Sequence, residues 1–298
     1  MNSSNKALQK ILVFISFVLI IAAWLTASYL SRLNKSSWQT KVESGQTEVH
    51  FIDVGQGDCQ LIRSGSMNVL IDAGESDKAA EVISYLDSFG IQRLDYVIAT
   101  HPHSDHIGAL DEVIEKYEIG KVIMPRLKEE IVPTTACYKS LLEAISKKGL
   151  KITEAVAGNT YQLDGSTLEI IAPVKKYDDI NNSSVVCRLV CGRTDFLFTG
   201  DIEKEAEQDI LDSGAFISAG VLKAAHHGSS GSSSAEFLEA VNMDYAVISC
   251  GADNSYGHPH DKAVSRINAI CKNIIRTDLS GNIVFYWDGN SLSYMTEK

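Results

Sequence analysis

The stretch that decides the fold runs from Asp95 to His106 and reads DYVIATHPHSDH. Its first half, through Thr100, is short and mostly apolar, which predicts a strand. Its second half places three histidines and one aspartate within six residues, directly after that strand. The whole chain has eight histidines, so packing does not explain why three of them gather here. A solvated polar loop is the alternative, and we favour a metal-binding loop over it.

The spacing of these side chains suits two neighbouring divalent ions. Residues two apart lie on the same side of an extended turn, which places His101 beside His103. Asp105 and His106 then point towards a second position nearby. The first position is rich in imidazole and the second mixes nitrogen with oxygen, and divalent metals accept both donor sets. We expect one or two ions, with zinc as the first candidate and manganese as the second, although iron also accepts such donors.

The pattern H-x-H-x-D-H after a strand resembles the signature of the metallo-β-lactamase superfamily. Within that superfamily, the chain is similar to the branch that contains the hydrolase-like domain of the ComEC competence protein. Further segments carry the same resemblance through their order and spacing: FIDVGQGD (51–58), NNSSV (181–185), FTGD (198–201), KAAHHGS (223–229) and NSYGHP (254–259). The resemblance covers most of residues 47–298 and implies an α+β fold, a four-layered αββα sandwich.

The resemblance also implies a role for each donor of the loop. His101 and His103 match ligands of a first metal, and Asp105 and His106 match ligands of a second. Asp201 matches the carboxylate that both ions share. A bridging anion suits two dications because it reduces their mutual repulsion. The alternative for Asp201 is a cap for the helix expected after it.

His226 and His227 need separate roles. They follow the expected strand Val221–Ala225, and adjacent residues of an extended chain point in opposite directions. By similarity we assign His227 to the second metal and His226 to the substrate side; the reverse assignment is the competing one. His258, in the segment NSYGHP, is a candidate for contacting the substrate or protonating the leaving group.

The chain departs from the superfamily pattern in one respect. Most hydrolases of the superfamily have a further histidine between the H-x-H-x-D-H loop and the shared aspartate, whereas this chain has no histidine between His106 and His226. Residues 181–184 (NNSS) occupy the equivalent stretch. Because amide and hydroxyl oxygens are poorer ligands than imidazole, we expect the first site to be weaker, more hydrated, or filled only when substrate is present.

Other polar residues near these motifs leave alternatives open. By similarity, Asp72 at the end of an expected strand holds the loop or a ligating histidine in place. Asp53 and Asp58 flank a Gly-Gln-Gly turn, where a turn-stabilising role competes with an active-site role. Residues 229–234 (SSGSSS) are either a flexible linker or a source of hydroxyl and backbone donors for an anionic substrate.

From residue 47 onward, short apolar runs alternate with amphipathic helical stretches. Strands are expected at 49–54, 59–62, 69–71, 96–100, 121–124, 168–172, 184–190, 196–199, 221–225, 246–250, 274–276 and 283–287, and helices at 78–89, 109–117, 138–148, 203–211, 236–241 and 263–270. This order predicts sheets packed inside helices. Because no linker divides the body, we treat residues 47–298 as one hydrolase domain.

The first 32 residues predict a membrane anchor. Ile11–Leu30 is a run of twenty residues without a charge, long enough to cross a hydrocarbon layer of about 30 Å. A cleaved signal peptide is the main alternative, and a buried core helix is the other. Basic residues flank both ends, so the orientation is weakly determined, and a short tail with two lysines favours a domain on the outer side of the cell membrane. Residues 33–46 are expected to be a polar tether.

Charge is distributed unevenly along the chain. Residues 1–40 hold four basic residues and no acid, so the rest carries 27 − 4 = 23 Lys+Arg against 38 Asp+Glu, a net charge of −15. Such an acidic body lacks the cationic field that attracts nucleic acid, which weighs against a plain DNA-binding module. The six cysteines form no C-x-x-C pair and no disulfide framework, so we interpret them mostly as small buried residues.

These observations lead to a functional hypothesis. A divalent ion lowers the pKa of a water that it binds from about 15.7 towards 7, which supplies hydroxide at neutral pH. We expect a membrane-anchored hydrolase, and the resemblance favours a phosphodiester substrate, either nucleic acid or an envelope phosphoester. Asp105 or Asp201 would orient the water, and His226 or His258 would protonate the leaving group. The alternatives are a non-hydrolytic accessory module in DNA uptake or envelope assembly, and a lactonase or β-lactamase.

Overall fold

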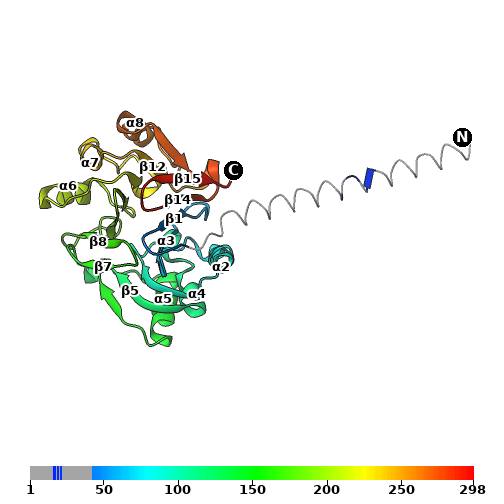
Figure 1. Cartoon of the computed structure of the whole chain (residues 1–298). Coiled ribbons are helices and arrows are strands. Elements are labelled where there is room, and N and C mark those ends of the chain that lie inside the picture. The colour runs from blue at the N-terminus through cyan, green and yellow to red at the C-terminus, as the bar shows by residue number, and fades with distance from the viewer. Residues whose placement is uncertain (1–15, 18, 20, 22–41) are drawn as a thin grey trace, which may run out of the picture. The chain divides into compact units, whose positions relative to one another are not determined.

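Two mixed β-sheets form the centre of residues 42–298 (Figure 1). The structure is a computed structural model that describes residues 16, 17, 19, 21 and 42–298. The first sheet has the strand order β15-β14-β1-β2-β3-β4-β5-β6, and the second has the order β13-β12-β11-β10-β9-β8-β7. Each sheet is antiparallel in one half and parallel in the other, and the parallel halves contain β3 to β6 and β10 to β13.

The strands are short and are distributed along the whole of residues 47–296. Those of the first sheet are β1 (Thr47–Phe51), β2 (Gln60–Ser64), β3 (Met67–Ile71), β4 (Arg93–Ile98), β5 (Glu118–Met124), β6 (Ile152–Glu154), β14 (Ile283–Trp287) and β15 (Leu292–Thr296). Those of the second sheet are β7 (Thr160–Gln162), β8 (Thr167–Ala172), β9 (Val186–Cys191), β10 (Thr194–Phe198), β11 (Val221–Lys223), β12 (Tyr245–Ile248) and β13 (Asn273–Arg276).

Helices cover the outer faces of the two sheets. Figure 1 shows α2, α4 and α5 on one side and α6, α7 and α8 on the other. The longer helices are α2 (Ala79–Ser88), α4 (Leu110–Lys116), α5 (Ala136–Lys147), α6 (Lys204–Ser213), α7 (Ala235–Val241) and α8 (Asp261–Ile270). Single turns are η1 (Ser76–Lys78), α3 (Ser104–Ile107), η2 (Glu129–Ile131), η3 (Ala225–Gly228) and α9 (Thr277–Ser280).

Alternation of side chains along the strands builds three apolar layers. Val69 and Ile71 of β3 and Phe196 and Phe198 of β10 point into the layer between the sheets. The residues between them face outward, so Leu70 packs with the helices α2, α4 and α5, and the second sheet packs in the same way against α6, α7 and α8. Because each sheet buries both faces, the expected αββα sandwich is confirmed for this region.

Three strands have no counterpart among the expected ones, and β1, β4, β11 and β12 each end two or three residues before the expected end. β6, β7 and β15 lie at sheet edges and leave most of their side chains partly or fully exposed, so they carry no continuous apolar run. β11 ends at Lys223, and the turn η3 begins at Ala225 where the sequence predicts the last residue of a strand. The cysteines behave as expected, because five of the six are buried and all six are free.

The expected membrane anchor cannot be followed in the same way. All of residues 1–32 except 16, 17, 19 and 21 lie outside the described residues, and so does the first part of the expected tether, 33–41. Among the residues that the structure describes, no helix combines the length and the apolar character needed to cross a bilayer. The anchor therefore stays a prediction.

Candidate metal site

The loop after β4 is anchored by the end of the neighbouring strand β3. These strands are parallel neighbours, so the residues that follow them meet at the same edge of the sheet. Asp72, which follows β3, is fully buried and has a left-handed backbone with φ of 56°. Its carboxylate accepts hydrogen bonds from the Thr100 amide at 2.8 Å and the Thr100 hydroxyl at 2.6 Å. Asp72 therefore fixes the point where the histidine-rich loop begins.

A single helical turn, α3, carries Asp105 and His106. His103 precedes this turn in an extended conformation, and its carbonyl accepts a hydrogen bond from the His106 amide at 3.1 Å. The Asp105 carbonyl in turn accepts a hydrogen bond from the Asp58 amide at 3.0 Å. A Cβ on Gly57 would lie only 2.4 Å from that carbonyl oxygen, and φ of Gly57 is 142°. Only glycine allows the preceding turn to pack so closely against α3.

The second sheet contributes two further donors from the ends of its parallel strands β10 and β11. Asp201 follows β10, and its amide donates to the Ser184 hydroxyl at 3.1 Å. His226 and His227 follow β11, and both have left-handed backbones, with φ of 50° and 52°. The expectation that an extended strand separates these histidines is therefore wrong. The turn η3 separates them instead, and it directs His227 into the buried interior and leaves His226 partly exposed.

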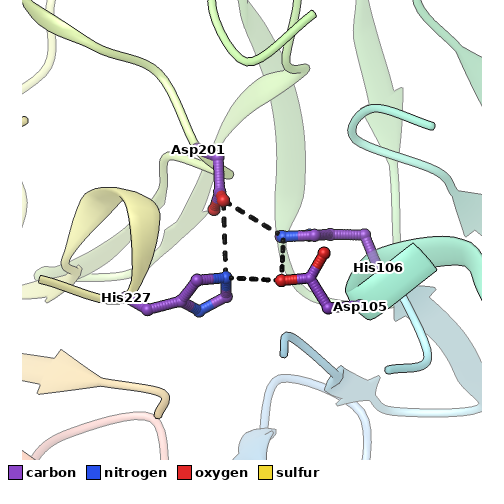
Figure 2. Close-up of side chains that lie close together, drawn as sticks. All are labelled: Asp105, His106, Asp201 and His227. Atoms are coloured by element: carbon purple, nitrogen blue, oxygen red, sulfur yellow. Dashed lines mark hydrogen bonds and ion pairs between the residues drawn. The ribbon is translucent and has the colours of Figure 1, made fainter. Parts of the chain in front are cut away.

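Four donors from the two sheets converge on one point (Figure 2). The Asp201 Oδ2 atom lies 3.3 Å from His106 Nε2 and 3.4 Å from His227 Nε2. The Asp105 Oδ2 atom lies 3.2 Å from His227 Nε2 and 3.9 Å from His106 Nε2. Tetrahedral zinc ligands at about 2.0–2.2 Å from the metal lie about 3.3–3.6 Å from one another. These four side chains therefore fit the ligand set of one divalent ion.

The far sides of the two imidazoles are already bonded. His106 Nδ1 lies 2.7 Å from the Asp72 carboxylate, and His227 Nδ1 lies 3.0 Å from the Ser249 carbonyl. When Nδ1 donates to these acceptors, the lone pair of each neutral ring lies on Nε2, which faces the cluster. His106 Nε2 and Asp201 Oδ1 are buried and make no well-formed hydrogen bond within the described residues. A metal ion bound between these nitrogen and oxygen atoms would give them the partner that they lack.

Charges within the cluster compensate one another. Burial lowers the pKa of His106, but the carboxylates of Asp201, Asp72 and Asp105 outweigh it and raise that pKa well above its usual value. The same balance, with Asp201 as the main charge, raises the pKa of His227. Burial acts to raise the pKa of Asp201, but the charges of His227 and His106 hold it well below its usual value. The surrounding carboxylates therefore favour the doubly protonated form of both imidazoles, and a metal ion competes with the proton on Nε2.

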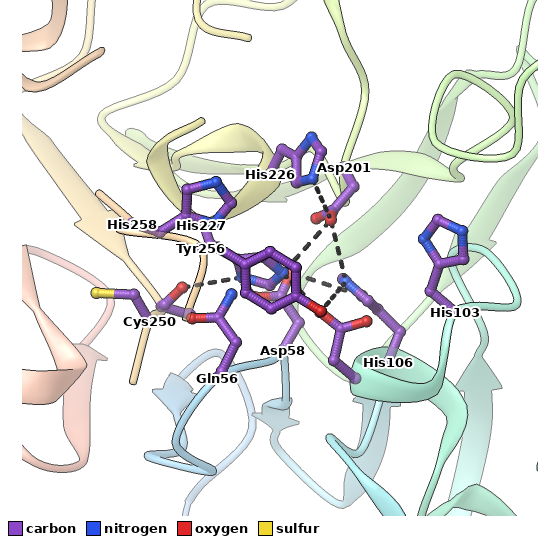
Figure 3. Close-up of polar contacts among 12 residues, drawn as sticks. Gln56, Asp58, His103, His106, Asp201, His226, His227, Cys250, Tyr256 and His258 are labelled. Carbon is purple, nitrogen blue, oxygen red and sulfur yellow. Dashed lines mark hydrogen bonds and ion pairs between the residues drawn. The ribbon is translucent and has the colours of Figure 1, made fainter. Parts of the chain in front are cut away.

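His101 and His103 form a separate pair. His101 Nε2 lies 3.0 Å from His103 Nδ1, and His101 Nδ1 lies 3.2 Å from the Ser184 hydroxyl. Figure 3 shows His103 on one side of the cluster. Within the described part of the chain, no group of three or more histidine, cysteine or acidic side chains gathered around one point includes either residue. The two donors of the expected first site thus lie together, but no third histidine, cysteine or acidic side chain of the described residues joins them.

Two residues of the segment 181–184, Asn182 and Ser184, have other partners. Asn182 Oδ1 accepts hydrogen bonds from the amides of Glu203 and Ala206 at 2.9 and 3.3 Å, so it caps the start of α6. Ser184 contacts both His101 and the backbone of Asp201. Ser184 therefore connects the His101–His103 pair to the main cluster of four side chains.

His226 and His258 lie at the rim of the cluster (Figure 3). His226 Nε2 lies 3.6 Å from Asp201 Oδ2, and its Nδ1 lies 3.3 Å from a Glu203 carboxylate oxygen. The rings of His226 and His258 are 5.6 Å apart between centroids. Burial, together with the charges of His227 and His226, lowers the pKa of His258 to about 4, so this ring is neutral at pH 7.

The serine-rich segment 229–234 is held firmly by the rest of the domain. All six of its backbone amides already donate within the protein, to acceptors on His226, His260, Ser229 and Glu207. Arg266 donates to three of the segment's carbonyls. Both the linker hypothesis and the proposal of backbone donors for a substrate are therefore wrong, because the segment is packed and its amides are occupied. A role for its hydroxyls stays a prediction.

The acidic residues of the Gly-Gln-Gly turn have different surroundings. Asp53 Oδ1 accepts a hydrogen bond from the Gly55 amide at 3.1 Å, as a turn-stabilising residue does. Asp58 is buried behind His227 and forms an ion pair with Lys223. The sequence analysis quotes Lys223 and Glu203 within its segments and assigns neither a role. The one signal for Lys223 was a lysine inside the apolar run VLKAA, where an unpaired charge is costly.

Comparisons with known proteins agree with this architecture. A family model described as the metallo-beta-lactamase superfamily matches residues 52–252. The chain is 31% identical over 266 residues to ComE operon protein 3 of Bacillus subtilis, covering 81% of this chain and 33% of that protein. It is 32% identical over 247 residues to competence protein ComA of Neisseria gonorrhoeae, covering 82% of this chain and 33% of that protein.

A solved structure supports the fold alone. CmlA, a diiron beta-hydroxylase from Streptomyces venezuelae, superposes with a TM-score of 0.52 at 12% identity, covering 83% of this chain and 54% of that one. The chain spans about a third of the length of the two curated relatives above. What those longer proteins do as a whole is therefore a separate question from what this domain does.

We predict that Asp72→Asn weakens the affinity for zinc about 10–100-fold, because a carboxylate that orients a ligating histidine contributes about that much. Competition with a chromophoric chelator measures the affinity. Asp53→Asn is the matched control, since the Asp53 carboxylate contacts the Gly55 amide and Lys298 but none of the proposed ligands, and it should bind zinc as the unchanged protein does. Equal zinc affinity in Asp72→Asn and the unchanged protein would contradict the role given to Asp72.

We also predict that zinc binding releases protons at pH 7, since the carboxylates around His106 and His227 favour the doubly protonated rings and the ion takes the place of the protons on Nε2. The apparent affinity should fall as the pH is lowered. Calorimetric titration in buffers with different ionisation enthalpies measures the released protons. A binding enthalpy that is the same in all buffers would show that the two imidazoles are already neutral.

Proposed function

Because the chain belongs to the metallo-β-lactamase superfamily, in its ComEC-like branch, we propose that residues 47–298 are a metal-dependent hydrolase that cleaves a phosphodiester. The observation that carries this proposal is the convergence of Asp105, His106, Asp201 and His227 from two sheets within 4.8 Å of one another. These four residues come from three separate segments of the chain, so packing or helix capping does not explain why they meet at one point.

The four converging side chains would hold the ion, with zinc as the first candidate and manganese as the second. A divalent ion bound there lowers the pKa of a water molecule towards neutrality and stabilises negative charge on a phosphoryl group. Asp105 is the most exposed of the four, with 21% of its side chain accessible, whereas the others are buried. Its carboxylate is therefore the group best placed to accept a hydrogen bond from the attacking water and orient it.

His226 is the residue best placed to protonate the leaving oxygen. Glu203 lies against its Nδ1 and would accept a hydrogen bond from it in the doubly protonated ring, so that Nε2, which lies on the side of Asp201, would carry the proton given to the leaving oxygen. His258 is neutral and borders His226, which suits it to orient a substrate oxygen through a hydrogen bond. This division separates two roles that the sequence leaves open.

His101 and His103 would bind a second ion more weakly than the main cluster binds the first. Their facing nitrogens lie 3.0 Å apart, somewhat closer than two ligands of one tetrahedral zinc ion, and a third imidazole is missing. Water and substrate oxygens would complete such a site. We therefore propose that it fills when the phosphodiester is present.

Nucleic acid is the phosphodiester that we propose. The similar proteins include a competence protein and, at 28% identity, recombination protein 2 of Haemophilus influenzae, and both names point to DNA. The acidic body of the chain gives no general attraction for such a polyanion. Recognition would therefore depend on the bound ions and on the histidines around them.

We propose that the domain is held at the cell membrane by a single-pass anchor within residues 1–32, with the catalytic domain outside. The uncharged run of twenty residues and its basic flanks support this proposal. Residues 33–46 would then act as the tether between anchor and domain. Such an arrangement would restrict hydrolysis to substrates near the membrane surface.

A second candidate function is a non-hydrolytic accessory module in DNA uptake or envelope assembly. The observation that favours it is the His101–His103 pair, which lacks a third partner of a ligating type in the described residues. A module of this kind would retain the main ion for structural reasons and would cleave nothing. Hydrolysis assays on the metal-loaded protein separate the two candidates.

We predict that the metal-loaded full chain cleaves single-stranded DNA or bis(4-nitrophenyl) phosphate, and that Asp201→Ala abolishes both zinc binding and cleavage. His226→Ala should retain zinc but lower kcat about 10²-fold or more, as loss of a general acid does. Asp212→Asn, a change on the exposed side of α6, is the control and should leave both properties intact.

The rates are measured by steady-state kinetics with metal content determined on the same samples. Cleavage that survives in Asp201→Ala at the unchanged rate would contradict the proposed site. A zinc-loaded protein that cleaves no phosphodiester would instead support the accessory function.

A further inference from the structure

Lys223 is a buried lysine directly behind the cluster, and the roles proposed above do not use it. It is the last residue of β11, and its side chain is fully inaccessible to solvent. Its Nζ atom forms an ion pair with Asp58, donates to the Gly200 carbonyl at 3.3 Å, and lies 3.9 Å from Asp201 Oδ1. Burial lowers the pKa of Lys223, but Asp58 and Asp201 outweigh it and raise that pKa above its usual value.

Asp58 contacts the same cluster from the other sheet. It lies in the connection between β1 and β2, and its amide donates to the Asp105 carbonyl at 3.0 Å. Its Oδ1 atom lies 3.5 Å from His227 Nδ1, and its Oδ2 atom lies 3.9 Å from His106 Nδ1. Figure 3 shows Asp58 behind the cluster, beneath His227. Asp58 thus approaches three of the four proposed ligands: its amide donates to the Asp105 backbone, and its carboxylate faces the far sides of His227 and His106.

The positions of these two residues match the division of the site into halves. Asp105 and His106 follow β4 of the first sheet, and Asp201 and His227 follow β10 and β11 of the second. A metal ion needs all four donors at once, so the separation of the two sheet edges sets how well the ligands fit it. Asp58 belongs to the first half and Lys223 to the second, and their ion pair joins the halves behind the point where the ligands meet.

We propose that the Asp58–Lys223 ion pair is a positioning element that holds the two halves of the metal site at the separation that the ion requires. The Lys223 ammonium donates to the Gly200 carbonyl of the turn that carries Asp201. The ion pair also holds Asp58 where its backbone amide donates to the Asp105 carbonyl of α3. Because both charges are buried, neither residue is stable there without the other, which makes the contact rigid. This inference rests on the proposed metal site but not on the choice of substrate.

The test is the zinc affinity of the full chain, measured by competition with a chromophoric chelator. Lys223→Met and Asp58→Asn should each weaken zinc binding about 10–100-fold, the size of effect seen when groups behind metal ligands are removed. The double variant should be about as weak as each single one, because the two residues act as one unit. Lys223→Arg, which keeps the charge, should retain affinity within a few-fold.

Arg188→Met is the matched control. Arg188 is also buried in the second sheet and pairs with Glu169 and Asp195, but none of its contacts reaches the cluster. This variant should lower the thermal midpoint and leave zinc affinity unchanged. The comparison separates a loss of general stability from a loss of ligand positioning.

A folded Lys223→Met/Asp58→Asn variant with unchanged zinc affinity would overturn the proposal, since the pair would then be only a replaceable part of the core. If the variants at Lys223 do not fold, Asp58→Asn decides the question by itself, because it keeps the shape of the side chain. A folded Asp58→Asn protein with unchanged zinc affinity overturns the proposal in that case. Failure of the unchanged protein to bind zinc would instead overturn the metal site.

Discussion

Buried charge at the meeting point of the two sheets is the constraint on which the rest of the structure depends. Asp58, Asp72 and Asp201 are almost completely buried, and a buried carboxylate is stable only when positive charge or hydrogen bonds surround it. The strand ends, the glycine turn against α3 and the left-handed turn η3 all serve to bring these carboxylates to imidazoles and to one lysine. A divalent ion at the centre completes this balance, which is why the fold and the proposed chemistry share the same residues.

The parts of the site that are local along the chain can be predicted from the sequence, and the parts that depend on packing between segments cannot. The loop HPHSDH predicts a metal site because its donors lie within six residues. Asp201 and His227 follow from resemblance, and the structure brings both to the same point. The roles of Lys223 and Glu203 do not follow from the sequence, because their partners are 165 and 23 residues away along the chain, at Asp58 and His226, and a lysine inside an apolar run does not reveal its partner. The serine-rich segment misleads for the same reason, since its composition does not reveal that Glu207 and Arg266 occupy its backbone groups.

The two halves of the expected dimetal centre differ in how complete they are. The main cluster has four donors, two of them imidazoles whose far sides are already bonded, and these features favour one tightly held ion. The pair His101–His103 is oriented by Ser184 but has no third imidazole. A centre of this kind can activate water with one ion and recruit a second through the substrate. Because only the main cluster is complete, and a single ion can have a structural role or a catalytic one, experiment must decide between hydrolysis and the accessory function.

Anomalous X-ray diffraction from crystals of the protein loaded with one equivalent of zinc would locate the ion. We expect a single strong peak between the two sheets, at about 2.0–2.2 Å from donor atoms of Asp105, His106, Asp201 and His227. A peak held by His101 and His103 with the main cluster empty, or no ordered zinc at all, would contradict the proposed metal site.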